Sequence, residues 1–268
     1  MDRPTWVPSE VDLTRPSAAR VYDYYLGGSH NLDVDRRMAR EAISMWPDLP
    51  VIMQSNRAFL RRAVRYLSGR GITQFLDIGS GIPTVGNVHE VAQQVSPQAR
   101  VAYVDRDPVA VAHSRAILAG DDRTVVVHAD LRDGDRILDD PSVQATIDVE
   151  RPVAVLMVAV LHFVPDEDDP PGAVARLRDR LAPGSHLVVS HASAEGRPEV
   201  AGAHRELYRR TATPMTMRTP AEIARFFDGF DLVDPGLVWL PLWRPDEPAT
   251  GQSRPERTTG LAGVGRKA

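Results

Sequence analysis

The sequence predicts an α/β protein with a Rossmann-like, mostly parallel sheet of seven strands, a terminal antiparallel strand and an N-terminal helical cap. Three observations predict this fold. From Gly71 onward, short apolar runs alternate with helical patterns, which is typical of a parallel sheet with crossover helices. The first of these runs breaks into a glycine turn. Two late strand candidates are joined by only three residues, too few for a parallel crossover, so we expect them to be antiparallel.

Helices are expected in the first 70 residues at 17–26, 33–46 and 52–67. Ser17 can cap the first helix, and the apolar residues Phe59, Ala63 and Leu67 recur at helical spacing in the third. These helices define the predicted cap, over 1–70.

The sheet is expected to occupy one domain over 71–245. Parallel strands are predicted at 74–77, 101–105, 124–128, 153–158 and 186–190, with helices at 85–95, 108–118, 133–139 and 172–181. A helix at 199–210 and a capped helix start at Thr219 precede a hairpin of strands at 230–233 and 237–243. The segment 246–268, rich in Pro, Gly, Arg and Thr, is predicted to be a mobile tail.

Composition favours a cytoplasmic enzyme that acts on a small molecule. The 268 residues carry a net charge of -4, which gives no electrostatic case for binding nucleic acid or an anionic membrane. The absence of cysteine excludes disulfides and thiolate zinc sites, and the first residues lack the pattern of a signal peptide. The longest apolar run, 153–164, is shorter than the ~20 residues that span a bilayer, so we interpret it as a core strand.

An acidic, glycine-rich turn follows the first predicted strand. Its two glycines let the backbone approach a ligand that a Cβ would obstruct, although a tight turn without a ligand is the alternative. Pro83 and Thr84 stand where a dinucleotide fingerprint has its third glycine, which disfavours NAD or FAD. The candidate cofactor-binding residues of this turn are Asp77, Gly79, Ser80 and Gly81.

Acidic residues also follow the second and third strands, at the edge of the sheet that carries the glycine turn. Asp105 can accept hydrogen bonds from both hydroxyls of a ribose, while Asp107 is better placed to cap the helix that begins at Pro108. Asp130 can accept from an adenine amino group with Leu131 covering the ring, and a solvated turn is its alternative. Clustered carboxylates disfavour a cofactor with phosphates, so we predict S-adenosylmethionine.

The ends of the second and fourth strands supply further candidates. Arg106 and Ala159 are candidate cofactor-binding residues. His162 follows the fourth strand, where the methyl group of the cofactor would lie, and is the candidate base or acceptor-orienting residue. A packing residue beside the cofactor is an equally good interpretation of His162. No His and carboxylate spacing indicates a metal site, and no serine elbow indicates a hydrolase.

The least generic motif is Ala19-Arg20-Val21-Tyr22-Asp23-Tyr24-Tyr25-Leu26-Gly27-Gly28, at the end of the first predicted helix. Its aromatic side chains and double glycine could let the N-terminal segment close over a cofactor. We therefore add Tyr22, Gly27 and Gly28 to the cofactor-binding candidates. Helix packing of the tyrosines and a simple helix stop are the alternatives.

Further segments accompany this motif: Asn56-Arg57-Ala58-Phe59-Leu60, the turn at 75–84, Tyr103-Val104-Asp105 and Gly263-Val264-Gly265-Arg266-Lys267. Together they resemble the actinobacterial S-adenosyl methyltransferases of methyltransferase family 19, and the resemblance covers most of the chain. It implies a class I methyltransferase fold and binding of S-adenosylmethionine. It supplies neither a methyl acceptor nor a catalytic residue.

The sequence thus predicts an S-adenosylmethionine-dependent methyltransferase that acts on an unidentified small-molecule acceptor, with no metal, nucleic-acid or membrane partner. Two other interpretations stay open. One is an NAD-dependent oxidoreductase on a similar sheet, and the other is a non-catalytic protein that binds S-adenosylmethionine as a sensor or partner subunit.

Overall fold

A computed structural model describes residues 4–9, 11–83, 86–209, 211, 213–247 and 254–268. Within them one sheet has the strand order β3-β2-β1-β4-β5-β8-β6, and β7 also pairs with β8. The pairs among β1 to β5 are parallel, so the predicted mostly parallel α/β fold is confirmed, but the sheet of the described residues has eight strands where seven were predicted. The strands are β1 (Gln74–Ile78), β2 (Arg100–Asp105), β3 (Thr124–His128), β4 (Ala154–Val158), β5 (His186–Ala192), β6 (Phe230–Leu232), β7 (Val238–Trp239) and β8 (Gly260–Lys267).

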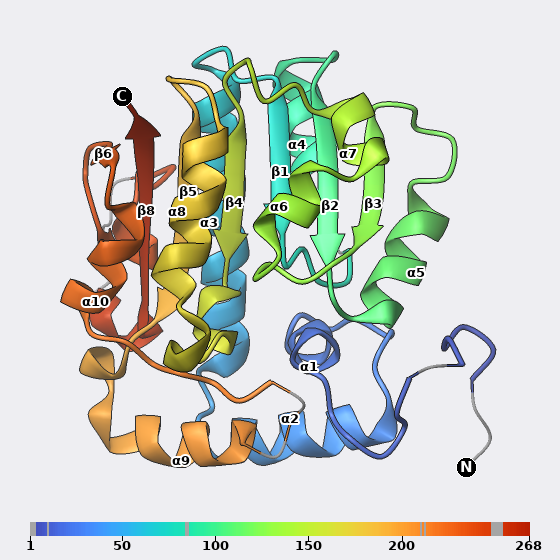
Figure 1. Cartoon of the computed structure of the whole chain (residues 1–268). Coiled ribbons are helices and arrows are strands. Elements are labelled where there is room, and N and C mark those ends of the chain that lie inside the picture. Colours follow the sequence, from blue (N-terminus) through green and yellow to red (C-terminus); the bar gives the residue numbers. More distant parts are fainter. Residues whose placement is uncertain (1–3, 10, 84–85, 210, 212, 248–253) are drawn as a thin grey trace.

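Helices cover both faces of this sheet (Figure 1). One face packs against α3 (Leu49–Ser68), α4 (Val88–Val95) and α5 (Pro108–Ile117). The other packs against α6 (Gly134–Leu138), α7 (Pro141–Thr146), α8 (Pro170–Arg180) and the segment around α10 (Pro220–Ala224). The remaining helices, α1 (Ala18–Tyr25), α2 (Asp33–Met45) and α9 (Pro198–Tyr208), lie beyond the carboxyl ends of the parallel strands (Figure 1). The helix of α7 was absent from the sequence-based prediction.

Burial on both faces explains the continuous apolar runs in the sequence. Phe75 of β1 packs on the α3 side of the sheet, whereas the neighbouring Leu76 and Ile78 pack on the α8 side. Because successive strand residues point to opposite faces, a strand covered on both sides needs apolar residues at every position. The run 153–164 is a strand only as far as Val158, after which a short 3-10 helix begins at Leu161.

Helix starts follow the predicted capping chemistry. The carboxylate of Asp107 accepts a hydrogen bond from the backbone N–H of Val109 at 2.8 Å, so its predicted role as the cap of α5 is confirmed. Thr219 and Glu222 form a reciprocal capping box at the start of α10. Ser17 occupies the cap position of α1, but its side chain does not cap the helix.

The cap differs from its predicted extent of 1–70. Phe59, Ala63 and Leu67 of α3 pack against the sheet, so α3 is one of the helices that flank it. The core of the cap instead joins α1 and α2 to α9, more than 150 positions later, through residues such as Trp46 and Tyr208. Periodicity alone could not assign α3 to the sheet, because it shows which side of a helix is buried and not what covers it.

The predicted hairpin of 230–233 and 237–243 is wrong. β6 and β7 do not pair with each other; both pair antiparallel with β8, with Phe230 opposite Lys267 and Trp239 opposite Leu261. They are two successive pieces of one sheet edge, interrupted by a turn. The short link was correctly interpreted as incompatible with a parallel crossover, but a single interrupted strand satisfies the same constraint.

The mobile tail predicted over 246–268 is also wrong from Gly260 onward. β8 lies inside the sheet between β5 and the β6–β7 edge. Its glycines are needed for packing: a Cβ at Gly265 would lie 2.7 Å from the Cβ of Phe230, and one at Gly263 would lie 3.0 Å from the ring of Phe227. Glycine content therefore reflected close packing here. Residues 248–253 of the predicted tail lie outside the described residues, as do Thr84, Val85 and Arg210 of the other predictions.

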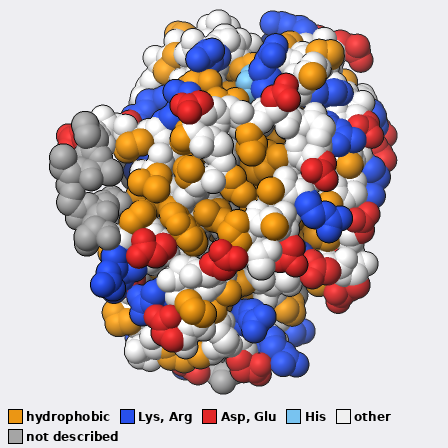
Figure 2. Space-filling model, turned by 90° about the vertical axis from the view of Figure 1, so that its left-hand side faces the viewer, with side chains coloured by type: hydrophobic (Ala, Val, Ile, Leu, Met, Phe, Trp, Pro, Cys, Tyr) orange, Lys and Arg blue, Asp and Glu red, His pale blue; other side chains and the backbone are white. Residues whose placement is uncertain are grey.

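The side of the molecule that carries β6 and α10 shows hydrophobic side chains gathered between arginines and acids (Figure 2). Leu232 of β6 is 42% exposed at this edge. Interruption of the edge into strands of three and two residues limits its pairing with another chain.

Among the described residues, we find no helix with the length and apolarity needed to cross a bilayer.

Candidate functional site

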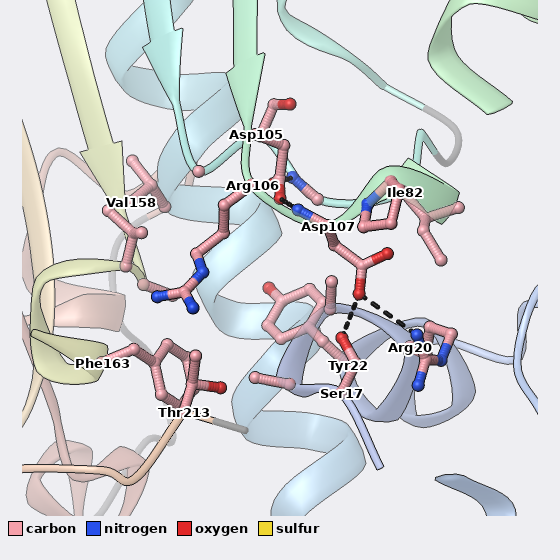
Figure 3. A pocket seen from close by; sticks show the side chains of 18 of the residues that line it. Ser17, Arg20, Tyr22, Ile82, Asp105, Arg106, Asp107, Val158, Phe163 and Thr213 are labelled. Atoms are coloured by element: carbon pink, nitrogen blue, oxygen red, sulfur yellow. Dashed lines mark hydrogen bonds and ion pairs between the residues drawn. The ribbon is translucent and has the colours of Figure 1, made fainter. Parts of the chain in front are cut away.

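A cavity of about 360 Å³ lies between the carboxyl ends of β1, β2 and β4 and the helix α1 (Figure 3). Its lining includes residues between 11 and 22, residues 56, 57 and 60 of α3, the glycine turn at 79–82, the loop at 105–108 and the end of β4 at 158–160. The carboxyl edge of a parallel sheet, where neighbouring connections diverge, is the usual place for a ligand in such folds. The predicted residues that line it are Tyr22, Asp77, Gly79, Ser80, Gly81, Asp105, Arg106 and Ala159.

Four aspartates line this cavity, Asp12, Asp77, Asp105 and Asp107, and the carboxyl groups of Asp77 and Asp105 are buried. Asp105 accepts hydrogen bonds from the backbone N–H groups of Gly81 at 2.7 Å and Asp107 at 2.8 Å. Burial raises the pKa of Asp105 to about 6 despite these donors. Burial also raises the pKa of Asp77 to about 7, and the nearby Asp105 adds to the increase. A ligand that brings hydroxyl donors or a positive charge would favour the ionised form of both groups.

The two glycines of the turn have different structural roles. Gly79 has φ +74°, and a Cβ there would lie 2.3 Å from the side chain of Val160, so a larger residue does not fit. Gly81 has φ +67°, but a Cβ there would meet no protein atom within 4 Å. Its backbone therefore faces open cavity while its N–H donates to Asp105. This is the geometry expected where a ligand approaches a backbone closely.

Four arginines line the same cavity: Arg15, Arg20, Arg57 and Arg106. Arg57 of α3 lowers the pKa of Asp77 through its charge, and its Nη2 donates to the Oδ1 of Asn87 at 3.2 Å. The buried Nε of Arg57 has no hydrogen-bond partner among the described residues. Arg106 lies in the cavity beside Val158 in Figure 3, and its Nη1 is 3.4 Å from the carboxylate of Asp130.

Helix α1 is attached to the cavity wall by a buried ion-pair network. Arg20, only 3% exposed, donates from Nε to Asp35 at 2.8 Å and from Nη1 to Asp107 at 3.3 Å. The hydroxyl of Ser17 also donates to Asp107 (Figure 3). The same carboxylate thus caps α5 and holds α1, which fixes the cap relative to the glycine turn. Arg20 and Asp35 were missed as site-forming residues, although Arg20 lies in the motif that carried the family resemblance.

A chain of hydrogen bonds runs from the end of β4 to α1. The Ala159 N–H donates to the Ser190 Oγ at 3.0 Å, and this hydroxyl donates to the Asn56 Oδ1 at 2.5 Å. The Asn56 Nδ2 donates to the Tyr22 hydroxyl at 2.9 Å, which donates to the Met53 carbonyl at 3.4 Å. Tyr22 is therefore held in place at the cavity by hydrogen bonds on both sides of its hydroxyl. Ser190 carried no sequence signal, because a serine in a strand is common.

Gly27 and Gly28 do not line the cavity. Gly27 has φ +79° at the end of α1, and the Gly28 N–H donates to the carbonyl of Asp23 at 2.9 Å. A Cβ at Gly28 would lie 2.0 Å from the carboxylate of Asp23, which accepts from the Asn31 side chain at 2.7 Å. The double glycine thus stops the helix, which was the alternative interpretation, and Gly28 packs against the buried side chain of Asp23.

Asp130 and Leu131 do not line the cavity either. Asp130 forms ion pairs with Arg132 at 2.7 Å and with Arg106 at 3.4 Å, and its carboxylate is engaged by them. Leu131 is buried in the core against the α8 side of the sheet. Sequence spacing placed both residues after β3 correctly. It could not show that the carboxylate of Asp130 would form ion pairs with the neighbouring Arg106 and Arg132. We do not carry these two residues into the proposed cofactor site.

His162 lines a second, smaller cavity next to the first. Burial keeps the pKa of His162 well below its usual value. Its Nδ1 accepts a hydrogen bond from the Ala192 N–H at 3.4 Å, so the proton of the neutral ring lies on Nε2. In this state the ring can donate a hydrogen bond from Nε2 but cannot take a proton there. The neutral ring is compatible with orienting an acceptor, and its contacts with the rings of Phe163 and His191 are equally compatible with the interpretation as a packing residue.

Together these residues suit an adenosine-type ligand that carries a positive charge. Carboxylates can accept from ribose hydroxyls and pair with an ammonium, and an arginine with an unpartnered buried Nε can receive a carboxylate. Among the described residues, no group of three or more acidic, His or Cys side chains could hold a metal ion.

Comparisons with known proteins agree with this chemistry. A family model described as S-adenosyl methyltransferase matches residues 4–268. The structure superposes on a putative methyltransferase from Thermobifida fusca YX with a TM-score of 0.92 and 44% sequence identity, covering 98% of this chain and 99% of that one. A DUF574 family protein from Streptomyces avermitilis MA-4680 gives a TM-score of 0.92 and 42% identity, covering 96% and 99%.

More distant matches are similar only in part. Human N-acetylserotonin methyltransferase, solved with S-adenosylmethionine, has a TM-score of 0.51 at 16% identity; 95% of this chain and 63% of that one are covered, and the likeness is one of fold alone. Ribosomal RNA small subunit methyltransferase H of Halorhodospira halophila is 36% identical over 63 residues, which span 24% of this chain and 19% of that protein.

Proposed function

The chain belongs to the S-adenosyl methyltransferase family, and from this premise we propose that it transfers a methyl group to a small-molecule acceptor from S-adenosylmethionine bound in the larger cavity. Its membership makes it an S-adenosylmethionine-dependent enzyme. The observation that carries the proposed location is the contact between Asp105 and the Gly81 N–H at 2.7 Å. It holds a buried carboxylate against a backbone that faces open cavity.

Different residues of the cavity lining contact different parts of the cofactor in this proposal. Asp105 accepts from the two ribose hydroxyls, as its remaining lone pairs allow. The glycine turn receives the methionine part, with Asp77 facing the ammonium and Arg57 the carboxylate. The ring of Tyr22 and the backbone at Ala159 face the centre of the cofactor, while the side chain of Arg106 covers the adenine.

When bound, S-adenosylmethionine supplies a methyl group activated by its sulfonium. The residues of this chain position the acceptor and keep water away, and orientation of this kind is worth ~7–11 kcal/mol in favourable cases. The buried hydrogen-bond chain from Ala159 to Tyr22 fixes the wall beside which the acceptor approaches. Burial raises the pKa of Tyr22 above its usual value. Tyr22 therefore keeps its proton and contributes to this wall by its position.

A small acceptor is supported by the shape of the site. The cavity is covered by the cap, and α1 is held to the wall by the ion pair of Arg20 and Asp107 at 3.3 Å. A polynucleotide or a folded protein would need this cover to be displaced. The net charge of -4 likewise does not favour a polyanionic acceptor.

Calorimetry with S-adenosylhomocysteine and NAD in parallel tests the cofactor. We expect S-adenosylhomocysteine to bind and NAD not to bind; binding of NAD alone would support the oxidoreductase. The protein is then incubated with methyl-labelled S-adenosylmethionine and an extract separated by size. Label in the low-molecular-weight fraction is expected, label in RNA or protein would contradict a small acceptor, and cofactor binding without any labelled product would favour a non-catalytic role.

A further inference from the structure

The second cavity has a volume of about 60 Å³ and lies between the cap and the ends of β4 and β5. It shares lining residues with the cofactor cavity, among them Tyr22, Asn56, Ala159 and Phe163. The hydrogen-bond chain through Asn56 runs along the boundary of the two spaces. A group held in the second cavity would therefore lie directly beside a cofactor held in the first.

The lining of the second cavity is apolar and aromatic. Trp46, Phe163 and Tyr208 contribute rings, and Met215 and Met217 contribute flexible thioether side chains. Within the described residues, none of the lining side chains is an Asp, Glu, Lys or Arg. A charged ligand would lose its hydration here without gaining a counter-ion, which is costly. The cavity thus selects against charge.

The lining histidines are neutral as well. Burial lowers the pKa of His191 to about 3 and that of His204 to about 4. His191 is fully engaged, since its Nδ1 donates to the Ala192 carbonyl at 2.8 Å and its Nε2 accepts from Arg218 at 2.9 Å. Arg218 in turn pairs with Asp166 at 2.6 Å and lies behind the lining. No net charge reaches the cavity from this side.

Two buried polar side chains in the lining have no hydrogen-bond partner among the described residues. They are His204 of α9, 5% exposed, with both ring nitrogens unpartnered, and Trp46 at the end of α2, 2% exposed, with its Nε1–H unpartnered. Their ring centroids are 5.3 Å apart. Leaving a buried polar group without a partner is costly, so two of them in one apolar cavity favour a ligand that provides the missing partners.

We propose that this second cavity binds the methyl acceptor, and that the acceptor is an uncharged aromatic molecule with a hydroxyl or ring nitrogen that hydrogen-bonds to His204 and Trp46. The proposal rests on the proposed function, because it needs the cofactor in the first cavity. In the reaction, a lone pair of the acceptor forms the bond to the methyl carbon as the carbon–sulfur bond breaks onto sulfur. Any proton displaced from the attacking atom is released to water.

The second cavity alone is too small for an aromatic ring. A cavity of 60 Å³ is smaller than the ~150 Å³ cavity that accommodates benzene in an engineered protein, so the ring must extend into the space shared with the cofactor cavity. This places the far end of the ring against His204 and the near end at the boundary residues Tyr22 and Ala159. Met215 and Met217 can adjust to rings of somewhat different size.

Ligand-observed fluorine NMR tests the proposal on the full chain saturated with S-adenosylhomocysteine. The probes are 4-fluorophenol and 5-fluoroindole, which are uncharged, and 4-fluorobenzoate, which is an anion of similar size. We expect at least one uncharged probe to bind, and the anion to bind at least tenfold more weakly. The variant His204→Phe should weaken the uncharged probe at least tenfold while the affinity for S-adenosylhomocysteine changes less than twofold.

His186→Phe is the matched control. His186 is also buried, its Nδ1 also lacks a partner among the described residues, and burial lowers its pKa to about 4, but it lines neither cavity. If His204→Phe does not fold, Trp46→Phe replaces the indole by a smaller ring without an N–H and should weaken binding of the probe as well. Equal probe binding in wild type and the cavity variants, equal binding of the anion, or no probe binding at all would overturn the proposal. Failure of the wild type to bind S-adenosylhomocysteine would overturn the proposed function instead.

Discussion

Ser190 of β5 donates a hydrogen bond to the Asn56 Oδ1 of α3 at 2.5 Å, across 134 positions of sequence. The same asparagine donates to the Tyr22 hydroxyl at 2.9 Å, so one side chain joins the sheet, a flanking helix and the cap. Each donor in this chain points the same way, from Ala159 towards the Met53 carbonyl. The wall between the two cavities is therefore set by a polar network with a defined direction.

Ser190→Ala tests this network. The variant leaves the Asn56 Oδ1 without its donor, and we expect the free energy of unfolding in urea to fall by about 1–3 kcal/mol. We also expect weaker binding of S-adenosylhomocysteine, because Tyr22 loses its fixed position. Ser185→Ala is the control: Ser185 is equally buried, accepts from the Val153 N–H at 3.1 Å and lies outside both cavities. Equal effects of both variants on cofactor affinity would show that the network has no role in the site.

Gly81→Ala separates backbone strain from loss of the ligand. Alanine at φ +67° costs about 1–2 kcal/mol of stability, and its methyl group would project into the cavity. Gly120 has φ +96° and also has open space around its Cβ position, but it is not among the residues that line the cavity. We expect both Gly81→Ala and Gly120→Ala to lower the melting temperature to a similar degree. Only Gly81→Ala should lower the affinity for S-adenosylhomocysteine, measured by calorimetry. An unchanged affinity would argue against cofactor contact at this turn.

Asp105→Asn tests the ribose assignment. Burial raises the pKa of Asp105 to about 6, so at pH 8 the folded protein holds an ionised carboxylate at some cost, which the amide removes. We therefore expect the stability at pH 8 to change by only about 1 kcal/mol, since the lost hydrogen-bond strength offsets that relief. The affinity for S-adenosylhomocysteine should fall at least tenfold. A variant with native affinity would refute this role.

Cofactor binding should depend on pH through the two buried carboxyl groups. The pKa is about 6 for Asp105 and about 7 for Asp77, and ligand hydroxyls and the ammonium favour the ionised forms. The affinity for S-adenosylhomocysteine should therefore rise from pH 5 to 8 and then level off. Proton release on binding, measured by calorimetry near pH 6.5 in two buffers of different ionisation enthalpy, should be positive. Proton uptake would contradict the assignment.

The raised pKa values of Asp77 and Asp105 also predict how the stability of the ligand-free protein changes with pH. The pKa values of both carboxyl groups are raised in the folded state, so between about pH 4 and 7 the folded protein binds more protons than the unfolded chain. Their contribution to the free energy of unfolding should decrease as pH rises through this window. Denaturation at several pH values checks this, and the decrease should be smaller in Asp105→Asn.

Removal of β8 should abolish the fold. A chain that stops at Thr259 would leave β5 and the β6–β7 edge without the strand that joins them. We expect it to be insoluble or to lack cooperative thermal unfolding by circular dichroism. Deletion of Ala268 alone, which follows β8 and is exposed, is the control and should leave the melting temperature unchanged.

Local patterns predicted the parallel strands and most of the helices. A strand that is buried on both faces needs consecutive apolar residues, and β1 and β4 have them. The glycine turn and Asp105 were likewise predictable, since their chemistry depends on strand ends and close neighbours. Long-range partners were not. Nothing near Gly260 indicates that β8 inserts beside β5, and nothing near Trp46 indicates that His204 lies against it. Arg132 beside Asp130 was visible in the sequence, but only the structure shows that the pair excludes the acid from the cavity.

The position of β8 bears on how the chain folds while it is being made. In sequence, β5 is followed by β6 and β7 and only then by β8, whereas in space β8 separates β5 from both. During synthesis from the N-terminus, the free edge of β5 and the β6–β7 segment must wait until β8 has left the ribosome. This delay leaves unpaired strand edges exposed, which is a condition under which chaperones act and chains associate. We expect the insertion of β8, and not the formation of the parallel strands β1 to β5, to be the rate-limiting step of folding.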